Sequence, residues 1–273
     1  MKNILIVIVL YKCKLNESKT YNSLIGGRTD VNIFIYDNSP YSQEIHQSNV
    51  IYQHDPNNRG LSYAYNTAAK YAQNHKCKWI LILDQDTTFE NDALSKYIEA
   101  ITKYPSISLF APIHKISNGK YISPTKYFHR TSKPSDSVPK GIIPLLPYAP
   151  INSGMLIRLE TFWQAGGYEN SVWLDFSDIQ FIEKIRKVID SFYVIDTTCI
   201  QDFSVLNSDI EKQKRRFQIF CQCARACKHE SIKDHIDYLY VTVKRCISLV
   251  IKNKSLSFIS IYLNNYFKSN SCK

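Results

Sequence analysis

No apolar stretch in this 273-residue chain approaches the roughly 18 residues that a membrane-spanning helix needs, so we expect no transmembrane helix. Glycine is scarce, with 8 residues, and proline contributes only 10, which excludes collagen-like and low-complexity chains. The 8 cysteines are scattered, unlike the dense pattern of a small secreted domain stabilised by disulfides. A reduced, cytoplasmic protein is the better interpretation.

The opening MKNILIVIVLYKCK imitates a secretory signal, because a lysine precedes an apolar run. No small-residue cleavage site follows that run, so we expect it to form a first buried strand. With 44% hydrophobic residues, the chain can bury the core of one large domain.

The formal net charge is +10, and lysine and arginine cluster in the last third, as in EKQKRRF and VKRCISLVIKNK. A basic surface indicates an anionic partner. Nucleic acid is not expected, because no zinc finger, RNP-like sequence or G-x-x-G clamp is present. Phosphorylated donors and the anionic inner face of a membrane remain.

Short apolar runs alternate with helical patterns over the first hundred residues, which predicts an α/β sheet with parallel strands. The clearest helix is GLSYAYNTAAKYAQNH, where apolar residues recur at helical spacing from Leu61 to Ala72. The expected strands cover residues 4–11, 31–36, 49–53 and 79–83.

Acidic residues follow two of these strands. Asp37 ends one, and Asp84 and Asp86 flank a glutamine after the run WILIL. In open parallel sheets ligands bind beyond the carboxyl ends of the strands, so these acids are expected to face one crevice. Two carboxylates one residue apart indicate a divalent metal. The alternative is a helix start, with Asp86 or Thr87 as the cap.

From residue 113 to 150 the periodicity is lost in a Pro-, Ser- and Lys-rich segment, which predicts a long loop. After this segment the pattern predicts a strand and a short helix, followed by a second helix whose first turn holds Asp178. Beyond Asp202 the pattern predicts one long helix, from about residue 208 to 230, and two shorter basic helices. We therefore expect a domain over residues 1–205 and a helical basic extension over 206–273.

As a set, VIVLYK, IYDNSP, NNRGLSYAYNTAAKYA, WILILDQDTTFEND, NSGMLIRLETFWQAGGYEN and WLDFSDIQFIEKIR resemble the family 2 glycosyltransferases of GT-A fold. The form LDQDT is most similar to their bacterial rhamnosyltransferase branch. The resemblance implies a Rossmann-like, mainly parallel mixed sheet flanked by helices. It also implies inverting, metal-dependent transfer of a sugar from a nucleotide-diphosphate donor to a saccharide acceptor.

The resemblance assigns the donor and metal residues. Asp86 would be the direct ligand of Mg²⁺ or Mn²⁺, with Asp84 on the ribose or on a metal-bound water, and Asp37 on the base or ribose. A hard cation held by few carboxylates can offset the charge of a departing diphosphate. The segment entering the second helix of the crevice also matches the family, and its residues are Asn58, Arg59, which could meet the diphosphate, and Gly60.

The resemblance makes Asp178 the base that takes the proton of the acceptor hydroxyl. Ser177 stands where the family has another acid, so Asp175 is a rival base, and a simple helix cap is the structural alternative for Asp178. Asp202 occupies the place of the histidine that ligates the metal in many GT-A enzymes. We take the histidines at positions 54, 114 and 129 as surface or loop residues.

The branch favours deoxythymidine diphosphate rhamnose as donor. It also favours an acceptor saccharide on a polyprenyl diphosphate carrier, in O-antigen or capsule polysaccharide assembly at the inner face of the cell membrane. The tail, DYLYVTVKRCISLVIKNKSLSFISIYLNNYFK, interleaves aromatic and aliphatic residues with lysines. That composition predicts helices that lie on an anionic membrane surface, or a third layer packed on the catalytic domain.

Two other functions compete. The sequence DQDTT also fits a haloacid-dehalogenase-like phosphatase with Asp84 as nucleophile and Asp86 as acid or base. Three strand-like segments precede the motif, however, and no later G-D-x-x-x-D pair follows. The second alternative is a sugar- or lipid-binding protein that keeps the fold without the chemistry.

Overall fold

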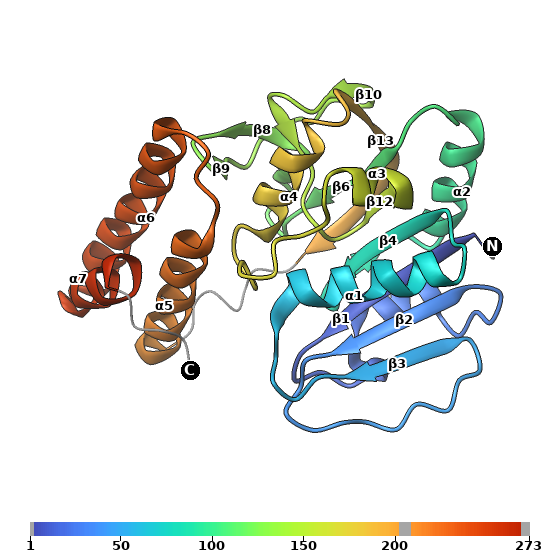
Figure 1. Ribbon diagram of the computed structural model, residues 1–273, viewed down its shortest axis with the longest axis horizontal. Coiled ribbons are helices and arrows are strands. Elements are labelled where there is room, and N and C mark those ends of the chain that lie inside the picture. The colour runs from blue at the N-terminus through green and yellow to red at the C-terminus, as the bar shows by residue number, and fades with distance from the viewer. Residues whose placement is uncertain (1–2, 202–208, 269–273) are drawn as a thin grey trace.

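The computed structural model describes residues 3–201 and 209–268, in which a mixed sheet is flanked by helices (Figure 1). The sheet order is β10-β13-β6-β12-β4-β1-β2-β3, with β5 beside β13 and β7 beside β6. A smaller sheet has the order β11-β8-β9. The strands are β1 (Ile4–Leu10), β2 (Asn32–Asp37), β3 (Val50–His54), β4 (Trp79–Asp84), β5 (Thr87–Phe89), β6 (Leu109–Lys115), β7 (Tyr121–Ser123), β8 (Thr125–Phe128), β9 (Thr131–Ser132), β10 (Gly141–Pro144), β11 (Tyr148–Ala149), β12 (Met155–Arg158) and β13 (Ser191–Gln201).

The strand directions bring one set of strand ends to a common edge. Strands β1, β2, β3 and β4 are mutually parallel, β12 is antiparallel to both β4 and β6, and β13 is parallel to β6. In the register, Leu10 pairs with Asp37 and Val9 pairs with Asp84. The two acids therefore lie at the same edge, as the alternation of strands and helices predicted.

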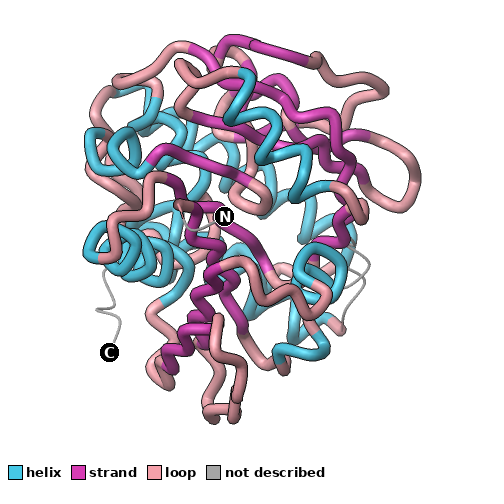
Figure 2. The backbone as a smooth tube through the Cα atoms, turned by 90° about the vertical axis from the view of Figure 1, so that its right-hand side faces the viewer, coloured by secondary structure: helices cyan, strands magenta, loops and turns pink. Residues whose placement is uncertain are grey.

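Helices cover both faces of the sheet (Figure 2). Alternate residues of β1 enter opposite cores: Leu5 and Val7 pack in the core that holds α1, α3 and α4, whereas Ile6 and Ile8 pack in the core that holds α2. The helices of the chain are α1 (Gly60–Asn74), α2 (Ala93–Lys103), α3 (Leu159–Gln164), α4 (Ser177–Ile185), α5 (Ile210–Ala226), α6 (Ile232–Asn253) and α7 (Ser257–Tyr262). The strands are apolar on both faces because both faces are covered.

The prediction of one long loop over residues 113–150 is wrong. This segment continues β6 and contains β7, β8, β9, β10 and β11, which are short strands of two to four residues. Strands this short leave too few residues for a period of two to be visible, and their partners lie far away in the sequence. Strand β13 was also missed, because polar residues interrupt its apolar pattern.

The C-terminal helices form a third hydrophobic core, and this core also includes residues from the first part of the chain. Buried side chains of α5, α6 and α7 pack together with Val172 and Phe176, from the loop that leads into α4. The predicted helix lengths were wrong, because α6, with 22 residues, is longer than α5, with 17. Among residues 3–201 and 209–268, no helix is long and apolar enough to cross a bilayer.

Candidate functional site

The acidic turn after β4 is braced by the N-terminal segment of the chain. The hydroxyl of Thr20 donates to the carbonyls of Asp84 and Thr87, and the Thr87 N–H donates to Thr20 Oγ1 at 3.1 Å. The side-chain amide of Gln85 pairs with the backbone N–H and carbonyl of Tyr11. The glutamine between the two acids therefore anchors the turn while the acids project from it.

Asp84 lies in a low-dielectric position. The hydroxyl of Tyr65, on α1, donates to Asp84 Oδ1 at 2.9 Å, and the Asp84 N–H donates to the hydroxyl of Ser153 at 3.2 Å. The pKa of Asp84 is raised to about 7: burial is the main cause, the charges of Asp86 and Asp178 contribute, and the hydrogen bond from Tyr65 opposes the rise. A cation beside this carboxylate would stabilise its ionised form and lower its pKa again.

Asp86 is exposed at the same turn. The alternative in which Asp86 or Thr87 caps the next helix is wrong, because Thr87 begins β5 and α2 has Asp92 at its N-cap. Among the described residues no group of three or more His, Cys, Asp or Glu side chains could hold a metal. Two carboxylates suit a magnesium-like ion that takes its other oxygens from water and phosphate.

Asp37 is fully buried at the end of β2. Its Oδ1 accepts the N–H of Ser39 at 2.9 Å, while Oδ2 accepts from Gln43 Nε2 at 2.8 Å and from the hydroxyl of Tyr52 at 2.9 Å. The carboxylate thus organises the connection from β2 to β3, at the edge that also holds Asp84.

The segment before α1 is fixed by a buried acid. Arg59 Nε donates to Asp55 Oδ2 at 2.9 Å, and the guanidinium lies 3.8 Å from the ring centre of Tyr63. Asn58 has a φ of 48° and Gly60 a φ of 87°. A Cβ on Gly60 would lie 2.3 Å from the carbonyl oxygen of Trp173, so glycine is required for the approach of that loop.

The loop before α4 carries Asp175 and Asp178. Both oxygens of Asp175 accept from the guanidinium of Arg216, on α5. Asp178 is partly buried in the first turn of α4, and its Oδ1 accepts the N–H of Ile179 at 2.8 Å. The pKa of Asp178 is raised to about 6: burial is the main cause, the charge of Asp175 contributes, and the hydrogen bond from Ile179 opposes the rise.

The residue between these acids, Phe176, has a φ of 65°, which is rare for a large side chain. Its ring packs on Phe220 and Tyr238 of the C-terminal helices, with centroids at 4.8 and 5.4 Å. Asp178 is not the N-cap residue of α4, because Phe176 occupies that position and Asp178 lies in the first turn.

Some predicted residues lie elsewhere or outside the structure described here. Asp202 falls within residues 202–208, outside the described residues. His114 was expected at the surface or in a loop, but it is completely buried in β6, with Nε2 2.7 Å from the carbonyl oxygen of Ser153. His54 ends β3, and His129 contacts Asp237 of α6.

Sequence reasoning missed the residues that position the acids: Tyr65, Ser153, Thr20 and Arg216. Tyr65 was counted as part of an apolar helix face. A buried tyrosine hydroxyl needs a hydrogen-bond partner, and that requirement was an available signal. Arg216 lies within a run of basic residues, where nothing distinguishes a paired arginine from a solvated one.

A sequence model of the family described as Glycosyl transferase family 2 matches residues 5–164. No curated protein matches. Among solved structures, S. aureus TarS 1-349 in complex with UDP-GlcNAc is similar, with a TM-score of 0.56 and 13% identity over 97% of this chain and 79% of that chain. GalNAc-T7 with UDP, GalNAc and Mn²⁺ gives a TM-score of 0.54 and 13% identity over 74% of this chain. The chain spans only 44% of the GalNAc-T7 chain, and these likenesses concern the fold alone.

Proposed function

The chain belongs to glycosyl transferase family 2, and we propose that it is an inverting, metal-dependent hexosyltransferase that uses a nucleoside-diphosphate sugar. The observation that carries the proposal is the proximity of three carboxylates. Asp84 and Asp86 share the turn after β4, and Asp178, from a distant helix, lies near enough to raise the pKa of Asp84. Candidate metal ligands and a candidate base thus share one site.

In this proposal Asp86 and Asp84 hold Mg²⁺ or Mn²⁺, and the donor diphosphate and water complete its coordination. The ion, when bound, offsets the negative charge that develops on the departing nucleoside diphosphate. Asp37 and the segment of Asn58, Arg59 and Gly60 bind the nucleoside and diphosphate at the neighbouring strand ends of the same edge. Asp202 is proposed as a further ligand from the chain after β13.

Asp178 is proposed as the base, and Asp175 as its positioning residue. Both oxygens of Asp175 are already engaged by Arg216, which disfavours proton transfer to them. With a pKa of about 6, Asp178 is mostly ionised at neutral pH and remains basic enough to accept a proton from an attacking hydroxyl.

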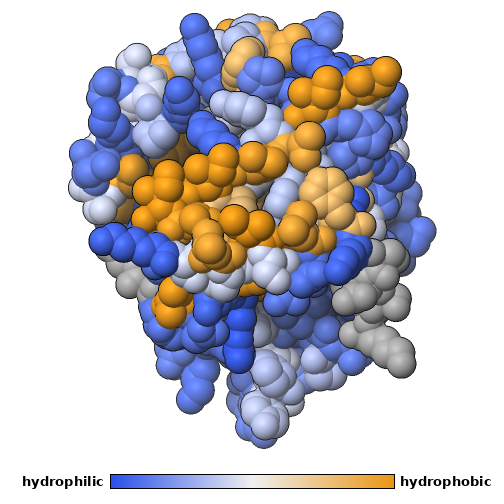
Figure 3. All heavy atoms as spheres, turned by 90° about the vertical axis from the view of Figure 1, so that its left-hand side faces the viewer, coloured by the Kyte–Doolittle hydropathy of each residue, from blue (hydrophilic) through white to orange (hydrophobic). Residues whose placement is uncertain are grey.

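We further propose that the C-terminal helices bind the anionic inner face of the cell membrane as a peripheral surface. Figure 3 shows a broad apolar band on this side of the molecule. The exposed large hydrophobic residues on α6, on α7 and directly beside α7 are Ile232, Ile236, Leu239, Tyr240, Ile247, Ile251, Leu256, Ile259, Leu263 and Phe267. An apolar helix face with basic flanks suits the interface of a bilayer.

The charges around this band support a lipid occupant. The acids of α6 are Asp234 and Asp237, and they face inward, where they pair with Arg130 and His129. The exposed charged residues of this part of the chain are Lys233, Lys244, Lys252, Lys254 and Lys268. The outward face is therefore basic, which favours an anionic leaflet over a second copy of this same basic surface.

The finer assignments extend this proposal. The donor is proposed to be deoxythymidine diphosphate rhamnose, and the acceptor a polyprenyl-diphosphate-linked saccharide in O-antigen or capsule assembly. The phosphatase alternative, with Asp84 as nucleophile, gains no support from the family match. A protein that binds sugar or lipid without transfer is the remaining alternative, and turnover separates it from an enzyme.

A screen of nucleotide sugars by thermal shift, with and without Mn²⁺, tests the proposal. We expect one nucleoside diphosphate sugar to raise the melting temperature only with the metal, and the same compound to be slowly hydrolysed. Stabilisation without turnover, even with an acceptor present, would indicate the binding protein. The absence of any stabilisation by nucleotide sugars would refute the glycosyltransferase proposal.

A further inference from the structure

Adjoining cavities lead from the candidate base to the C-terminal helices. One cavity of about 450 Å³ borders Asp178, and another of about 920 Å³ lies between the β8–β9 hairpin and α6. Thr131 and Lys244 line both, so the two cavities adjoin at these residues, and we call the pair the composite space. The larger cavity is also lined by Lys126 and Lys133, and its lining residues include no Asp or Glu.

Adjacent residues of α6 present cations to this space. Arg245 lines the smaller cavity, and its guanidinium stacks 4.6 Å from the ring centre of Phe220. Its Nε is buried and has no hydrogen-bond partner in the described part of the chain. Lys244 is exposed and lies 5.7 Å from the ring centre of Tyr240. A buried guanidinium nitrogen without an acceptor is costly unless a ligand supplies one.

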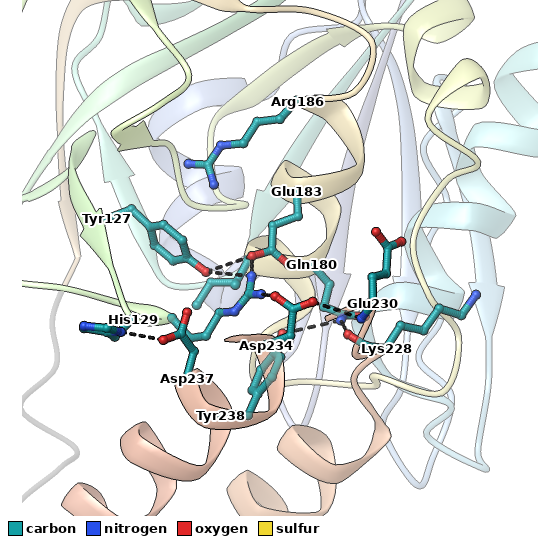
Figure 4. Close-up of polar contacts among 12 residues, drawn as sticks. Tyr127, His129, Gln180, Glu183, Arg186, Lys228, Glu230, Asp234, Asp237 and Tyr238 are labelled. Atoms are coloured by element: carbon teal, nitrogen blue, oxygen red, sulfur yellow. Dashed lines mark hydrogen bonds and ion pairs between the residues drawn. The ribbon is translucent and has the colours of Figure 1, made fainter. Parts of the chain in front are cut away.

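The smaller cavity is also lined by Asp175 and Asp178, and of these two Asp175 is already paired with a cation. Arg216 holds both oxygens of Asp175. Arg130, in the turn between β8 and β9, pairs with Glu183 of α4 and Asp234 of α6. Figure 4 shows these two acids directed toward each other between the helices. The Arg130 side chain is only 7% exposed, so this cluster fastens the hairpin against the helices and fixes the walls of the composite space. Within residues 3–201 and 209–268 no ion pair engages Lys244 or Arg245, so their positive charge is available to an external anion.

We propose that the composite space binds a phosphate or diphosphate group of the acceptor, with Lys244 and Arg245 as the binding residues. This inference rests on the proposed function, since it gives Asp178 an acceptor hydroxyl beside an anchored phosphate. Lys126 and Lys133 add to the positive charge of the site. Together these cations match a phosphate or diphosphate ligand better than a ligand that carries a single carboxylate. Phe128 and Tyr240 add ring surface to the larger cavity for the rest of the acceptor.

Calorimetric titration of the full chain tests this site, with inorganic pyrophosphate and geranyl diphosphate as probes. The buffer contains EDTA, so that no metal recruits either probe to the turn of Asp84 and Asp86. We expect Lys244→Gln and Arg245→Gln each to weaken binding about 10-fold, the usual value of a charge-assisted hydrogen bond. Lys103→Gln, at an exposed lysine in the last turn of α2 that lines neither cavity, is the matched control and leaves the affinity unchanged.

The outcomes are distinct. Unchanged affinity in both cavity variants would overturn the inference, as would a wild-type protein that binds neither probe. Because Lys244 is exposed, its variant keeps the fold even if the Arg245 variant does not. Tighter binding of geranyl diphosphate than of pyrophosphate would support a lipid-linked acceptor, and equal binding would support a phosphate carried by the saccharide.

The same protein preparation separates this inference from the proposed function. If a nucleotide sugar with Mn²⁺ stabilises the wild type and the phosphate probes do not bind, the acceptor site is wrong and the transferase proposal stands. If the probes bind through Lys244 and Arg245 but no nucleotide sugar does, the transferase proposal is wrong and the cavity is a phosphate site of another activity.

Discussion

Arg216 of α5 holds both carboxylate oxygens of Asp175, with Nη2 at 2.6 Å from Oδ1 and Nη1 on Oδ2. This ion pair joins the C-terminal helices to the loop that carries the candidate base, Asp178. The neighbouring Phe176 lies in the same core as α5, α6 and α7. The extension is therefore a structural part of the candidate site, and its removal would expose that core.

Asp86→Ala should abolish metal-dependent donor binding and leave the fold intact. Asp86 is exposed, so its removal opens no cavity in the core. The measurement is the thermal shift caused by the nucleotide sugar with Mn²⁺. Asp30→Ala is the control, since Asp30 precedes β2, at the opposite edge of the sheet. Metal-dependent stabilisation equal to that of the wild type would remove Asp86 from the metal site.

Asp178→Asn should keep donor binding but lower the transfer rate on the order of 10²–10⁴-fold, the usual contribution of a positioned base. In the wild type, transfer should fall as the pH drops through about 6, because protonation of Asp178 removes the base. Asp175→Asn should lose less rate, and its pH profile should move to lower pH, because the charge of Asp175 helps to raise the pKa of Asp178. The reverse pattern would exchange the roles of the two acids.

Gly60→Ala should destabilise the protein much more than Gly27→Ala. Both glycines have positive φ, 87° and 82°, so alanine costs about 1–2 kcal/mol of backbone strain at either site. Only at Gly60 does the added Cβ meet the backbone of Trp173; at Gly27 nothing lies within 4 Å. Overpacking adds about 1–3 kcal/mol. Urea denaturation measures the difference, and equal losses would mean that the loop contact is easily displaced.

His114 should make stability depend on pH. Burial lowers its pKa from 6.5 to about 4, so the unfolded chain takes up a proton at a higher pH than the folded protein. The stabilisation is complete above pH 6.5 and is lost as the pH falls to about 4, by roughly 3 kcal/mol. His114→Gln keeps a donor for the Ser153 carbonyl and does not titrate. Denaturant midpoints from pH 4 to 7 should show a weaker pH dependence in that variant than in the wild type.

Ile251→Asp should weaken binding to anionic liposomes about 10-fold or more, because Ile251 is 70% exposed within the apolar band. Ile142→Asp, on β10, makes the same change of charge at a residue that is 54% exposed, and should bind as the wild type does. Flotation with phosphatidylglycerol vesicles measures both. Binding should also fall as salt screens the lysines. Equal flotation of the two variants would assign the band to another partner.

The sequence alone determined the sheet edge of the site. Continuous apolar runs ending in Asp37 and Asp84 predict buried strands, and parallel strands must bring those ends together, so local pattern and strand direction sufficed. The same reasoning located α1, because its apolar residues repeat at helical spacing over 15 residues.

Tertiary structure alone decided what surrounds those acids. Three contacts connect residues that lie 39 to 94 positions apart in the sequence. Asp178 lies near Asp84, Arg216 pairs with Asp175, and the buried His114 bonds the carbonyl of Ser153. Periodicity reports which face of an element is apolar, but not which distant element covers it. Side-chain packing in the folded chain selects those partners, and in the described part of the chain it leaves Lys244 and Arg245 without an ion pair.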